Sequence, residues 1–333
     1  MKTLLIWITV ISFSLFLTGC TINPSGIEAE GKVVSPGKAK PSMTQVETKE
    51  FTFTSKPEKA TYQLGEPVYM TFKLLNNTDK TKRVISDLDP SIGAVSLKIK
   101  GNNDKDQIEF IPFVEFDFDE NVFAYLKRNE SVSSIAPIFF GGKGWTFNKP
   151  GTYSVNAFYS AVNEKGELEV TSAPVVQIVI SDKESQIISI DNEINSASWE
   201  AGKFLLWQAG DHLQKGQEVL SAILSRNPES LMAAYTHSAF AHSFSDNFMD
   251  YRKKEVRKAD CNRVQEHLSK VGSGVSEYVL VQNAMSSLRC AAREEDAKQV
   301  DQSFQTISRI TNGKQEYSAI LERAAELSGR KNK

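Results

Sequence analysis

The apolar residues of this chain change their spacing once, near residue 190, and this change limits the folds that the chain can adopt. From about residue 51 to residue 180, apolar and polar residues alternate, and turn residues recur about every 8–12 positions. From about residue 196, apolar residues recur with helical spacing and turn clusters become rare. The sequence therefore predicts a multidomain protein with an all-β domain over residues 50–182, followed by an all-α domain over residues 195–330.

The alternation is clearest in three runs of the predicted all-β domain. Each run places apolar side chains on one face of a strand, because successive side chains of a strand point to opposite faces. The apolar positions are Val68, Met70, Phe72 and Leu74 in the first run, Val95, Leu97 and Ile99 in the second, and Tyr153, Val155, Ala157 and Tyr159 in the third. We expect these side chains to form the core of a sandwich or barrel.

Two stretches of this domain resemble bacterial immunoglobulin-like domains. Residues 62–68 resemble the turn that leads into an early core strand, and residues 147–155 resemble the turn and start of a late strand. The resemblance implies an immunoglobulin-like β-sandwich in which the Tyr153 hydroxyl bonds back to nearby backbone, as in a tyrosine corner. The sequence departs from antibody domains because no Cys lies between residues 21 and 260. This fold resemblance says almost nothing about function.

The predicted all-α domain contains several helical stripes. They comprise Leu231, Tyr235, Ser238 and His242, then Val300, Phe304, Ile307 and Ile310, and finally Tyr317, Ile320, Leu321, Ala324 and Leu327. The dipeptide Asn227-Pro228 predicts a helix start, with Asn as the N-cap and Pro in the first helical position. We expect about six or seven helices, stacked as antiparallel hairpins.

Part of this domain resembles a tetratricopeptide repeat. The matching residues, in the order of the repeat, are Trp207, Ala209-Gly210, Leu213, Gly216, Ala222 and Asn227-Pro228. Only six positions separate Ala222 from Pro228, about half of the spacing in the repeat, and no second copy is evident. The resemblance therefore implies a repeat-like helical domain.

The amino terminus is organised like a signal peptide. Lys2 precedes an apolar run from Leu4 to Leu17, which is short for a membrane span. The tetrad that ends this run, Leu17-Thr18-Gly19-Cys20, resembles the lipobox of bacterial lipoproteins. In that family the Cys thiol is acylated, with chains such as palmitate, and a peptidase cleaves before the Cys. The resemblance implies a lipoprotein signal peptide over residues 1–19 and lipidation of Cys20. An ordinary secretory leader and an uncleaved anchor are the alternatives.

Residues 20–49 predict a disordered tether, because they contain prolines, lysines and small polar residues but almost no large apolar ones. About 30 such residues span roughly 30 Å. By resemblance to lipoprotein sorting, Thr21 in place of Asp favours the outer membrane, with the protein facing the periplasm. In a host with a single membrane, the anchor would hold the protein at the cell-membrane surface.

Cysteine usage favours a location outside the cytoplasm. With Cys20 assigned to lipid, Cys261 and Cys290 remain, and an even remainder in an exported chain predicts a disulfide. The two residues lie 12 positions before and 17 positions after Ser273, which sits in a Gly-Ser-Gly turn. An antiparallel helix hairpin about this turn would bring them level. Two independent buried thiols are the alternative.

No motif in the sequence indicates catalysis. The four histidines are His212, His237, His242 and His267, and the middle two are five positions apart, whereas zinc-binding helices use four. No Gly-x-Ser-x-Gly elbow is present. Residues 141–144 are rich in Gly but lack the spacing of a phosphate loop, and they predict a mobile or hairpin loop instead. The sequence predicts no catalytic residue, no cofactor, no metal site and no enzymatic activity.

Three further clusters have both a structural and a functional interpretation. The acidic residues Glu115, Asp117, Asp119 and Glu120 predict a solvated strand or a protected edge, with a cation site at Asp117, Asp119 and Glu120 as the alternative. The aromatic residues Phe110, Phe113, Phe116, Phe118, Phe123 and Tyr125 predict core filling, with an exposed ligand patch as the alternative. The basic residues Arg252, Lys253, Lys254, Arg257 and Lys258 predict a solvated helix face paired with Glu255, with contact to an anionic polymer or an acidic partner as the alternative.

These observations predict a membrane-anchored envelope lipoprotein that acts as a non-enzymatic, protein-binding scaffold. Its expected partners are the membrane, through the anchor at Cys20, and another envelope protein. The formal net charge of −2 argues against nucleic acid as a partner. The alternatives are a cell-envelope enzyme or accessory that acts on cell-wall polymer or peptide, and an inhibitor or chaperone-like sandwich that pairs through an edge strand.

Overall fold

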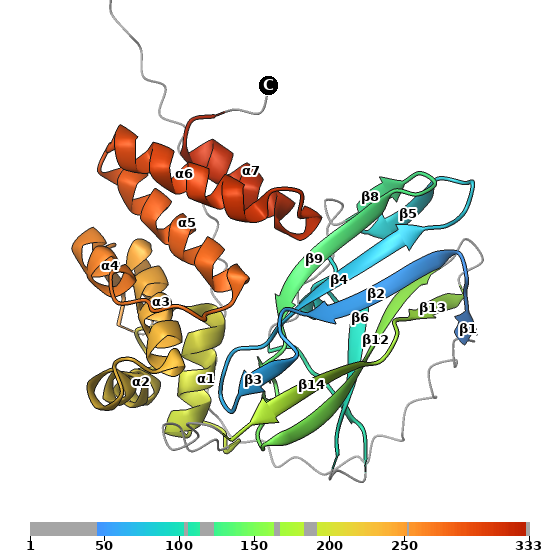
Figure 1. Ribbon diagram of the computed structural model, residues 1–333, viewed down its shortest axis with the longest axis horizontal. Coiled ribbons are helices and arrows are strands. Elements are labelled where there is room, and N and C mark those ends of the chain that lie inside the picture. Colours follow the sequence, from blue (N-terminus) through green and yellow to red (C-terminus); the bar gives the residue numbers. More distant parts are fainter. Residues whose placement is uncertain are drawn as a thin grey trace, which may run out of the picture. The chain divides into compact units, whose positions relative to one another are not determined.

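The computed structural model of the chain describes residues 45–102, 106–113, 123–162, 167–182, 192–251 and 253–330. The predicted signal peptide, Cys20, nearly all of the tether and the acidic cluster at residues 115–120 lie outside the described residues. We call residues 45–182 the β part and residues 192–330 the α part. Apart from one short hairpin in the α part, strands precede helices along the chain, so the protein is of mixed β plus α class (Figure 1). The predicted domain boundaries stay a prediction.

The larger sheet of the β part is built around one long central strand, β12 (Gly151–Val162). Its seven strands are β1 (Gln45–Glu47), β13 (Leu168–Ser172), β12, β14 (Val176–Ser181) and β3 (Thr61–Gln63), with β6 (Val95–Gly101) and β7 (Ile108–Glu109) on the other side of β12. β6, β13 and β14 pair with β12 in antiparallel fashion, whereas β1 and β3 join as parallel outer strands.

A second sheet has three antiparallel strands, in the order β2 (Phe51–Pro57), β4 (Tyr69–Asn76) and β9 (Ser131–Pro137). Its inner side chains and those of the larger sheet belong to one hydrophobic core. Two short pairs complete the β part, β5 (Lys82–Ile85) with β8 (Phe123–Leu126), and β10 (Phe140–Gly141) with β11 (Gly144–Trp145). A 3-10 turn, η1 (Pro90–Ile92), follows β5.

The predicted alternation is confirmed by burial. Every apolar residue that the three sequence runs assigned to the core is at most 6% exposed. The Tyr153 hydroxyl donates to the Lys149 backbone oxygen at 2.9 Å, which is the bond expected of a tyrosine corner. Core filling also accounts for part of the predicted aromatic cluster, because Phe110 and Phe113 pack against the main core. Tyr125 is 69% exposed.

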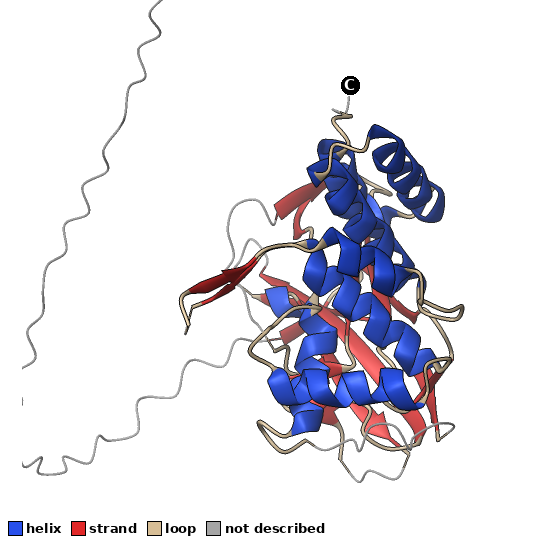
Figure 2. Ribbon diagram, turned by 90° about the vertical axis from the view of Figure 1, so that its left-hand side faces the viewer, coloured by secondary structure: helices blue, strands red, loops and turns tan. Residues whose placement is uncertain are grey.

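The α part contains seven α-helices among the described residues. They are α1 (Ala197–Trp207), α2 (Gln214–Arg226), α3 (Leu231–Ser245), α4 (Cys261–Leu268), α5 (Glu277–Arg293), α6 (Ala297–Thr311) and α7 (Ser318–Leu327), with a 3-10 turn, η3 (Gln315–Tyr317), before α7. Ser or Asp side chains cap the amino termini of α1, α3, α4, α5 and α6. α3 is buried on nearly all sides because α1, α2, α4 and α5 pack around it. Figure 2 shows the helices in front of the strands of the β part. Within the described ranges, no helix is both long and apolar enough to cross a membrane.

Two sequence expectations in the α part are wrong. Asn227 ends α2 rather than starting α3, whose N-cap is Ser230, because the Ser230 hydroxyl accepts from the Ala233 N–H at 3.1 Å. The basic run is a β-hairpin rather than a helix face, formed by β15 (Phe248–Asp250) and β16 (Glu255–Arg257). Arg257 ties this hairpin back to neighbouring segments, because it donates to the Asp211 carboxylate at 2.6 Å and to the Ser243 backbone oxygen at 2.8 Å.

Buried polar contacts join the β part to the α part. Glu66 is 4% exposed, and its carboxylate accepts hydrogen bonds from the Lys59 ammonium at 2.7 Å, the Gln63 N–H at 2.9 Å and the Tyr235 hydroxyl of α3 at 3.1 Å. The Lys59 ammonium also donates to the Gly274 backbone oxygen of the α part at 2.7 Å. A buried charge is tolerated when it is paired and hydrogen-bonded in this way.

A second set of contacts lies beside the first. Glu58 accepts from the Tyr278 N–H at the start of α5, at 3.0 Å. The Tyr278 ring packs against the Tyr69 ring on the outer face of β4, with 4.6 Å between ring centroids. These contacts hold α5 against the three-stranded sheet.

Candidate functional site

One edge of the three-stranded sheet is open. β9 pairs with β4 on one side only, and the bonds that flank this pairing run from the Asn76 N–H to the Glu130 oxygen and from the Ile138 N–H to the Val68 oxygen. In an antiparallel pair, alternate residues bond to the same neighbour. Even-numbered residues of β9 therefore bond to β4, and the backbone groups of Ser131, Ser133 and Ile135 point away from it.

A side chain of the α part occupies one end of this edge. Gln315 of η3 donates its amide to the Ser131 backbone oxygen, and the Ser131 hydroxyl donates to the Gln315 side-chain oxygen at 3.0 Å. Within the described part of the chain, the outward backbone N–H and C=O groups of Ser133 and Ile135 have no hydrogen-bond partner. Ser133 and Ile135 are half-buried and therefore retain contact with solvent. The open section of the edge thus begins next to Gln315.

The open edge lies in a cavity of about 390 Å³, which we call the β9 groove. Its lining comprises Ser86, Asp87 and Asp89 after β5, Val132, Ser133, Ser134 and Ile135 of β9, Tyr278 of α5, and Gln315, Glu316, Ser318, Ala319 and Ile320 of η3 and α7. The segment after β5 is held in place because the Leu88 N–H donates to the Ser134 hydroxyl at 2.9 Å. The groove is therefore built by both parts of the chain.

The β9 groove is acidic. Its charged lining residues are Asp87, Asp89 and Glu316, and the described lining includes no Lys or Arg. Asp89 caps η1, with its carboxylate accepting from the Ser91 N–H at 2.8 Å, and burial raises the pKa of Asp89 above its ordinary value. Asp87 is exposed and Glu316 half-buried. A cation entering the groove would meet two solvent-accessible carboxylates.

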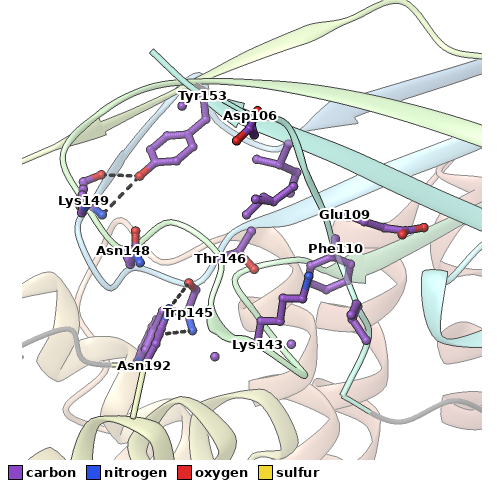
Figure 3. A pocket seen from close by; sticks show the side chains of 16 residues that line it. Asp106, Glu109, Phe110, Lys143, Trp145, Thr146, Asn148, Lys149, Tyr153 and Asn192 are labelled. Atoms are coloured by element: carbon purple, nitrogen blue, oxygen red, sulfur yellow. Dashed lines mark hydrogen bonds between the residues drawn. The ribbon is translucent and has the colours of Figure 1, made fainter. Parts of the chain in front are cut away.

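A second cavity, of about 420 Å³, lies at the end of the larger sheet (Figure 3). Its walls include Lys143, Lys149, Asp106, Glu109 and Tyr153. The Tyr153 hydroxyl is already bonded to the backbone of Lys149. The side chains of this cavity carry both signs of charge, so it shows no single electrostatic preference.

The glycine-rich loop at residues 141–144 borders this second cavity. Of the two predicted forms, a mobile loop or a hairpin, the structure shows the hairpin, because β10 and β11 pair across it. Gly144 has a φ of +88°, and an added Cβ would lie 2.5 Å from the Asn192 side-chain oxygen. Asn192 holds the hairpin by accepting from the Trp145 N–H at 2.8 Å, so the glycine at 144 allows a close approach between the loop and Asn192. The loop has a structural role.

The four histidines that the sequence offers as candidate site residues lie at three separate places. His237 and His267 face each other, with 2.8 Å between their Nδ1 atoms, and burial lowers the pKa of both, to about 4 for His267. Burial likewise lowers the pKa of His242 to about 4. His212 stacks on Phe248. The imidazoles of His237, His242 and His267 are therefore uncharged near neutral pH. Within the His237–His267 pair, one Nδ1 carries a hydrogen and donates it to the other Nδ1.

His242 lies near a serine, but the geometry does not create a nucleophile. The Ser286 hydroxyl is 3.4 Å from the His242 Nδ1, it also donates to the Gln282 backbone oxygen at 3.1 Å, and Ser286 is fully buried. Among the described residues, no three His, Cys, Asp or Glu side chains converge to hold a metal ion.

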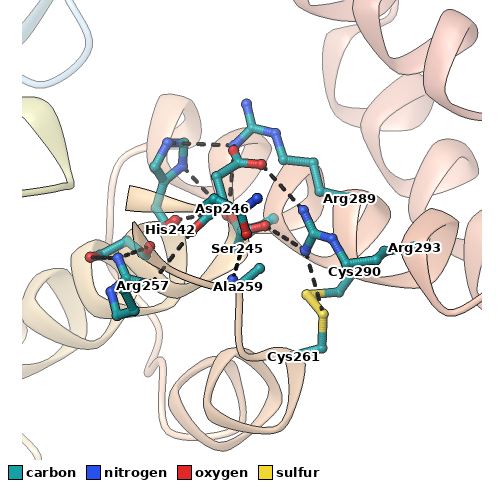
Figure 4. Close-up of polar contacts among 12 residues, drawn as sticks. His242, Ser245, Asp246, Arg257, Ala259, Cys261, Arg289, Cys290 and Arg293 are labelled. Atoms are coloured by element: carbon teal, nitrogen blue, oxygen red, sulfur yellow. Dashed lines mark hydrogen bonds and ion pairs between the residues drawn. A yellow bond between two sulfur atoms is a disulfide. The ribbon is translucent and has the colours of Figure 1, made fainter. Parts of the chain in front are cut away.

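The disulfide predicted from the cysteine count is confirmed. Cys261 at the start of α4 is bonded to Cys290 of α5, with 5.5 Å between their Cα atoms (Figure 4). Beside it, Asp246 pairs with Arg289 at 3.3 Å and with Arg293 at 3.5 Å. The disulfide and these ion pairs clamp the end of α3, the start of α4 and the last turns of α5 together.

Comparison with known proteins gives little guidance. No protein-family model and no curated protein sequence matches the chain. A solved β-glucosidase from Erythrobacter marinus is 16% identical over 39% of this chain and 15% of its own, with a TM-score of 0.24. The sporulation control protein Spo0M from Bacillus subtilis is 10% identical over 48% of this chain and 55% of its own, with a TM-score of 0.25.

A β-glucosidase from Listeria innocua, solved in complex with isofagomine, is 10% identical over 39% of this chain and 16% of its own, with a TM-score of 0.23. The chain thus spans only about 15% of the length of the β-glucosidases it matches. Likeness at this level supports no conclusion about fold or function.

Sequence reasoning did not identify the β9 groove. One sequence feature indicates an edge strand, namely Pro137 at the end of the uncharged run 131–137. Proline has no N–H to donate to a neighbouring strand, so within sheets it is confined to edges. The walls of the groove carry no such signal, since η3 lies about 180 positions further along the chain.

Proposed function

We propose that this chain is a lipid-anchored protein of the bacterial cell envelope that binds another protein and has no catalytic activity of its own. The lipobox-like tetrad ending at Cys20 supports the anchor. The Cys261–Cys290 disulfide supports export, because such bonds persist in oxidising compartments and are rare in the cytosol. The anchor favours the outer membrane, facing the periplasm.

The observation that carries the binding role is the β9 groove. An edge strand with free backbone groups is a ready template for pairing with another chain, and proteins ordinarily block such edges with charges, bulges or covering segments. Here Gln315 of the α part bonds to one end of the edge, whereas the outward backbone groups of Ser133 and Ile135 have no hydrogen-bond partner among the described residues and border a cavity. This arrangement suits recognition of a partner segment.

We also infer a finer description of the two parts. The tyrosine-corner bond of Tyr153 and the shared core of the two sheets support an immunoglobulin-like sandwich for the β part. Contacts between consecutive helices, as in α1 with α2 and α5 with α6, support stacked, repeat-like hairpins for the α part.

Site-specific photocrosslinking in the host envelope tests the binding role. A benzophenone side chain at Ala319, an exposed residue of the β9 groove, is expected to capture one reproducible protein. The same group at Gln305, an exposed residue of α6 outside the groove, is the control and should not capture it. If Ala319 captures no protein, or if both positions capture the same ones, the groove is not the binding site.

The anchor has its own test. A Cys20→Ser variant is expected to retain its leader and to incorporate no labelled fatty acid, because the thiol is the acylated group in the family that the tetrad resembles. Fatty-acid labelling that continues in this variant would contradict the lipid anchor.

The open β9 edge also favours the alternative of an inhibitor or chaperone-like protein that pairs through an edge strand. The identity of the protein crosslinked at Ala319 distinguishes an inhibitor from a chaperone. An inhibitor would be crosslinked to a folded hydrolase, and a chaperone to unfolded envelope proteins. The alternative of an envelope enzyme or accessory stays a prediction.

A further inference from the structure

We propose that the β9 groove binds an extended, cationic peptide segment of a partner protein, which adds to β9 as an extra strand. This inference rests on the proposed binding role and gives the chemistry of the partner. Three features carry it: the direction of the free backbone groups of β9, the walls of the groove and the charge of its lining.

The free backbone groups define how a strand would pair. Ser133 and Ile135 each offer an N–H and a C=O, and Pro137 at the same edge offers a C=O only. A strand rises about 3.3 Å per residue, so Ser131 to Ile135 spans about 13 Å. Gln315 already satisfies the Ser131 oxygen with its side-chain amide, which is the group that a neighbouring strand would otherwise supply. An added strand would therefore pair along Ser133 to Pro137 and end beside Gln315.

The walls restrict what can pair with this edge. Residues 86–89 border the groove on one side, and η3 with the start of α7 borders it on the other. A cavity of about 390 Å³ accepts one short extended segment but not a preformed sheet. A second copy of this chain would bring its own walls and its own Asp87 and Glu316 to the same place, where like charges repel. The groove is therefore suited to a flexible segment of another protein.

The charge of the lining selects a basic segment. Asp87 and Glu316 are accessible, Asp89 is half-buried in the same lining, and the described lining offers no cation to neutralise them. Alternate side chains of an added strand point to one face, so Lys or Arg at every second position would meet the carboxylate of one wall, either Asp87 or Glu316. Backbone bonds would supply the affinity, and the charges would select the sequence.

Fluorescence anisotropy with a labelled probe tests the proposal on the folded chain carrying Cys20→Ser, which removes the lipid. The probe is a hexapeptide that alternates lysine and valine. One matched peptide has glutamate in place of lysine, and a second has N-methyl groups on the alternate amides that would face β9. N-methylation removes two or more hydrogen bonds of about 1 kcal/mol each, so we expect it to weaken binding by at least about tenfold.

Variants of the protein test strand pairing and charge selection independently of the peptides. Ser133→Pro removes an outward N–H, and Ser133→Ala is its control, because both variants lose the hydroxyl bond to the Phe72 oxygen of β4 and only the alanine variant retains that N–H. The double variant Asp87→Asn and Glu316→Gln removes the accessible charges, and Glu322→Gln on an exposed turn of α7 is its control. We expect about tenfold weaker binding for the proline variant and about fivefold weaker binding, at low salt, for the charge variant. Both controls should bind like the parent.

Several results would overturn the inference. Equal binding of the lysine and glutamate peptides would remove the charge selection, and equal binding of the N-methylated peptide would remove the strand pairing, even if the proline variant fails to fold. Binding that appears only after deletion of residues 20–44 would make the chain's own lysine-containing segment the occupant. If photocrosslinking at Ala319 captures a partner but no peptide binds, the proposed function stands and strand addition fails.

Discussion

Loss of the disulfide is expected to cost a large share of the stability of the α part. We expect the double variant Cys261→Ala and Cys290→Ala to lower the free energy of unfolding by about 3.6 kcal/mol. The bond joins residues with a sequence separation of 29. The entropy of cross-linking an unfolded chain over a loop of that length gives about 3.6 kcal/mol at 25 °C. Because domains unfold with about 5–15 kcal/mol, the loss is easily measured.

The native contacts around the bond explain why the loss arises chiefly in the unfolded state. Asp246 pairs with both Arg289 and Arg293, and Arg293 also donates to the Ser245 backbone oxygen at 2.9 Å. These contacts keep α3 and α5 together without the sulfur–sulfur bond. Cys290 is 1% exposed, so truncation to Ala removes one packed atom and adds about 1 kcal/mol at most.

Urea unfolding followed by circular dichroism measures the effect. Both proteins carry Cys20→Ser, so that no third thiol can exchange with the pair. We expect the variant to unfold at a lower urea concentration and with a slightly larger dependence on urea, because its unfolded chain is more expanded. The oxidised parent treated with dithiothreitol should lose nearly the same stability, and the variant should not respond to dithiothreitol.

The reasoning would be refuted by a loss below about 1 kcal/mol in both comparisons, since the loop-entropy relation would then not govern this bond. A loss in the alanine variant without a loss on reduction would also refute it. That result would assign the effect to packing at Cys290.

Two further predictions concern single residues. Burial raises the pKa of Glu58 above its ordinary value of 4.5. The folded state therefore binds this proton more tightly than the unfolded chain does, and the stability that this binding contributes is complete below about pH 4.5 and is lost as the pH rises through the raised pKa. We expect Glu58→Gln to raise the melting temperature at neutral pH and to have little effect near about pH 4. An added Cβ at Gly216 of α2 would lie 2.4 Å from the Glu200 backbone carbon of α1. We expect Gly216→Ala to destabilise the fold by about 1–2 kcal/mol in urea unfolding, because this clash exceeds the gain of about 1 kcal/mol in helix propensity.

Each of these predictions has a control. Glu322→Gln removes an exposed carboxylate and should give the same melting temperature as the parent at both pH values. Gly272→Ala places a Cβ where no atom lies within 4 Å and should leave stability nearly unchanged. A Glu58→Gln variant that is less stable than the parent at neutral pH would show that its bond to the Tyr278 N–H outweighs the burial of its charge.

Local patterns in the sequence were sufficient to predict the elements that neighbouring residues determine. The alternation at Val68 to Leu74 predicted a buried strand face because every second residue of a strand faces the core. The Gly-Ser-Gly turn predicted the approach of Cys261 to Cys290 because a helix hairpin fixes which positions come level. In both cases the decisive residues lie within about 30 positions of each other.

The errors and omissions have a different origin. The basic run has helix-forming residues, but the contact of Arg257 with Asp211, 46 positions earlier, holds it in a hairpin. The β9 groove depends on contacts between residues about 180 positions apart, and the bond from Tyr235 to Glu66 spans 169 positions. Single-sequence patterns carry no information on which distant segments meet, so the site that most favours a function could not be predicted.

The pairing of Tyr69 with Tyr278 bears on any attempt to divide this protein. Tyr69 is 2% exposed because residues of α3 and α5 pack against it, and Tyr235, which bonds Glu66, is equally buried. Fragments produced by a cut near residue 190 would expose aromatic surface on both halves, and exposed apolar patches of this kind favour aggregation. Shortened versions for crystallisation or display should therefore keep strands and helices together.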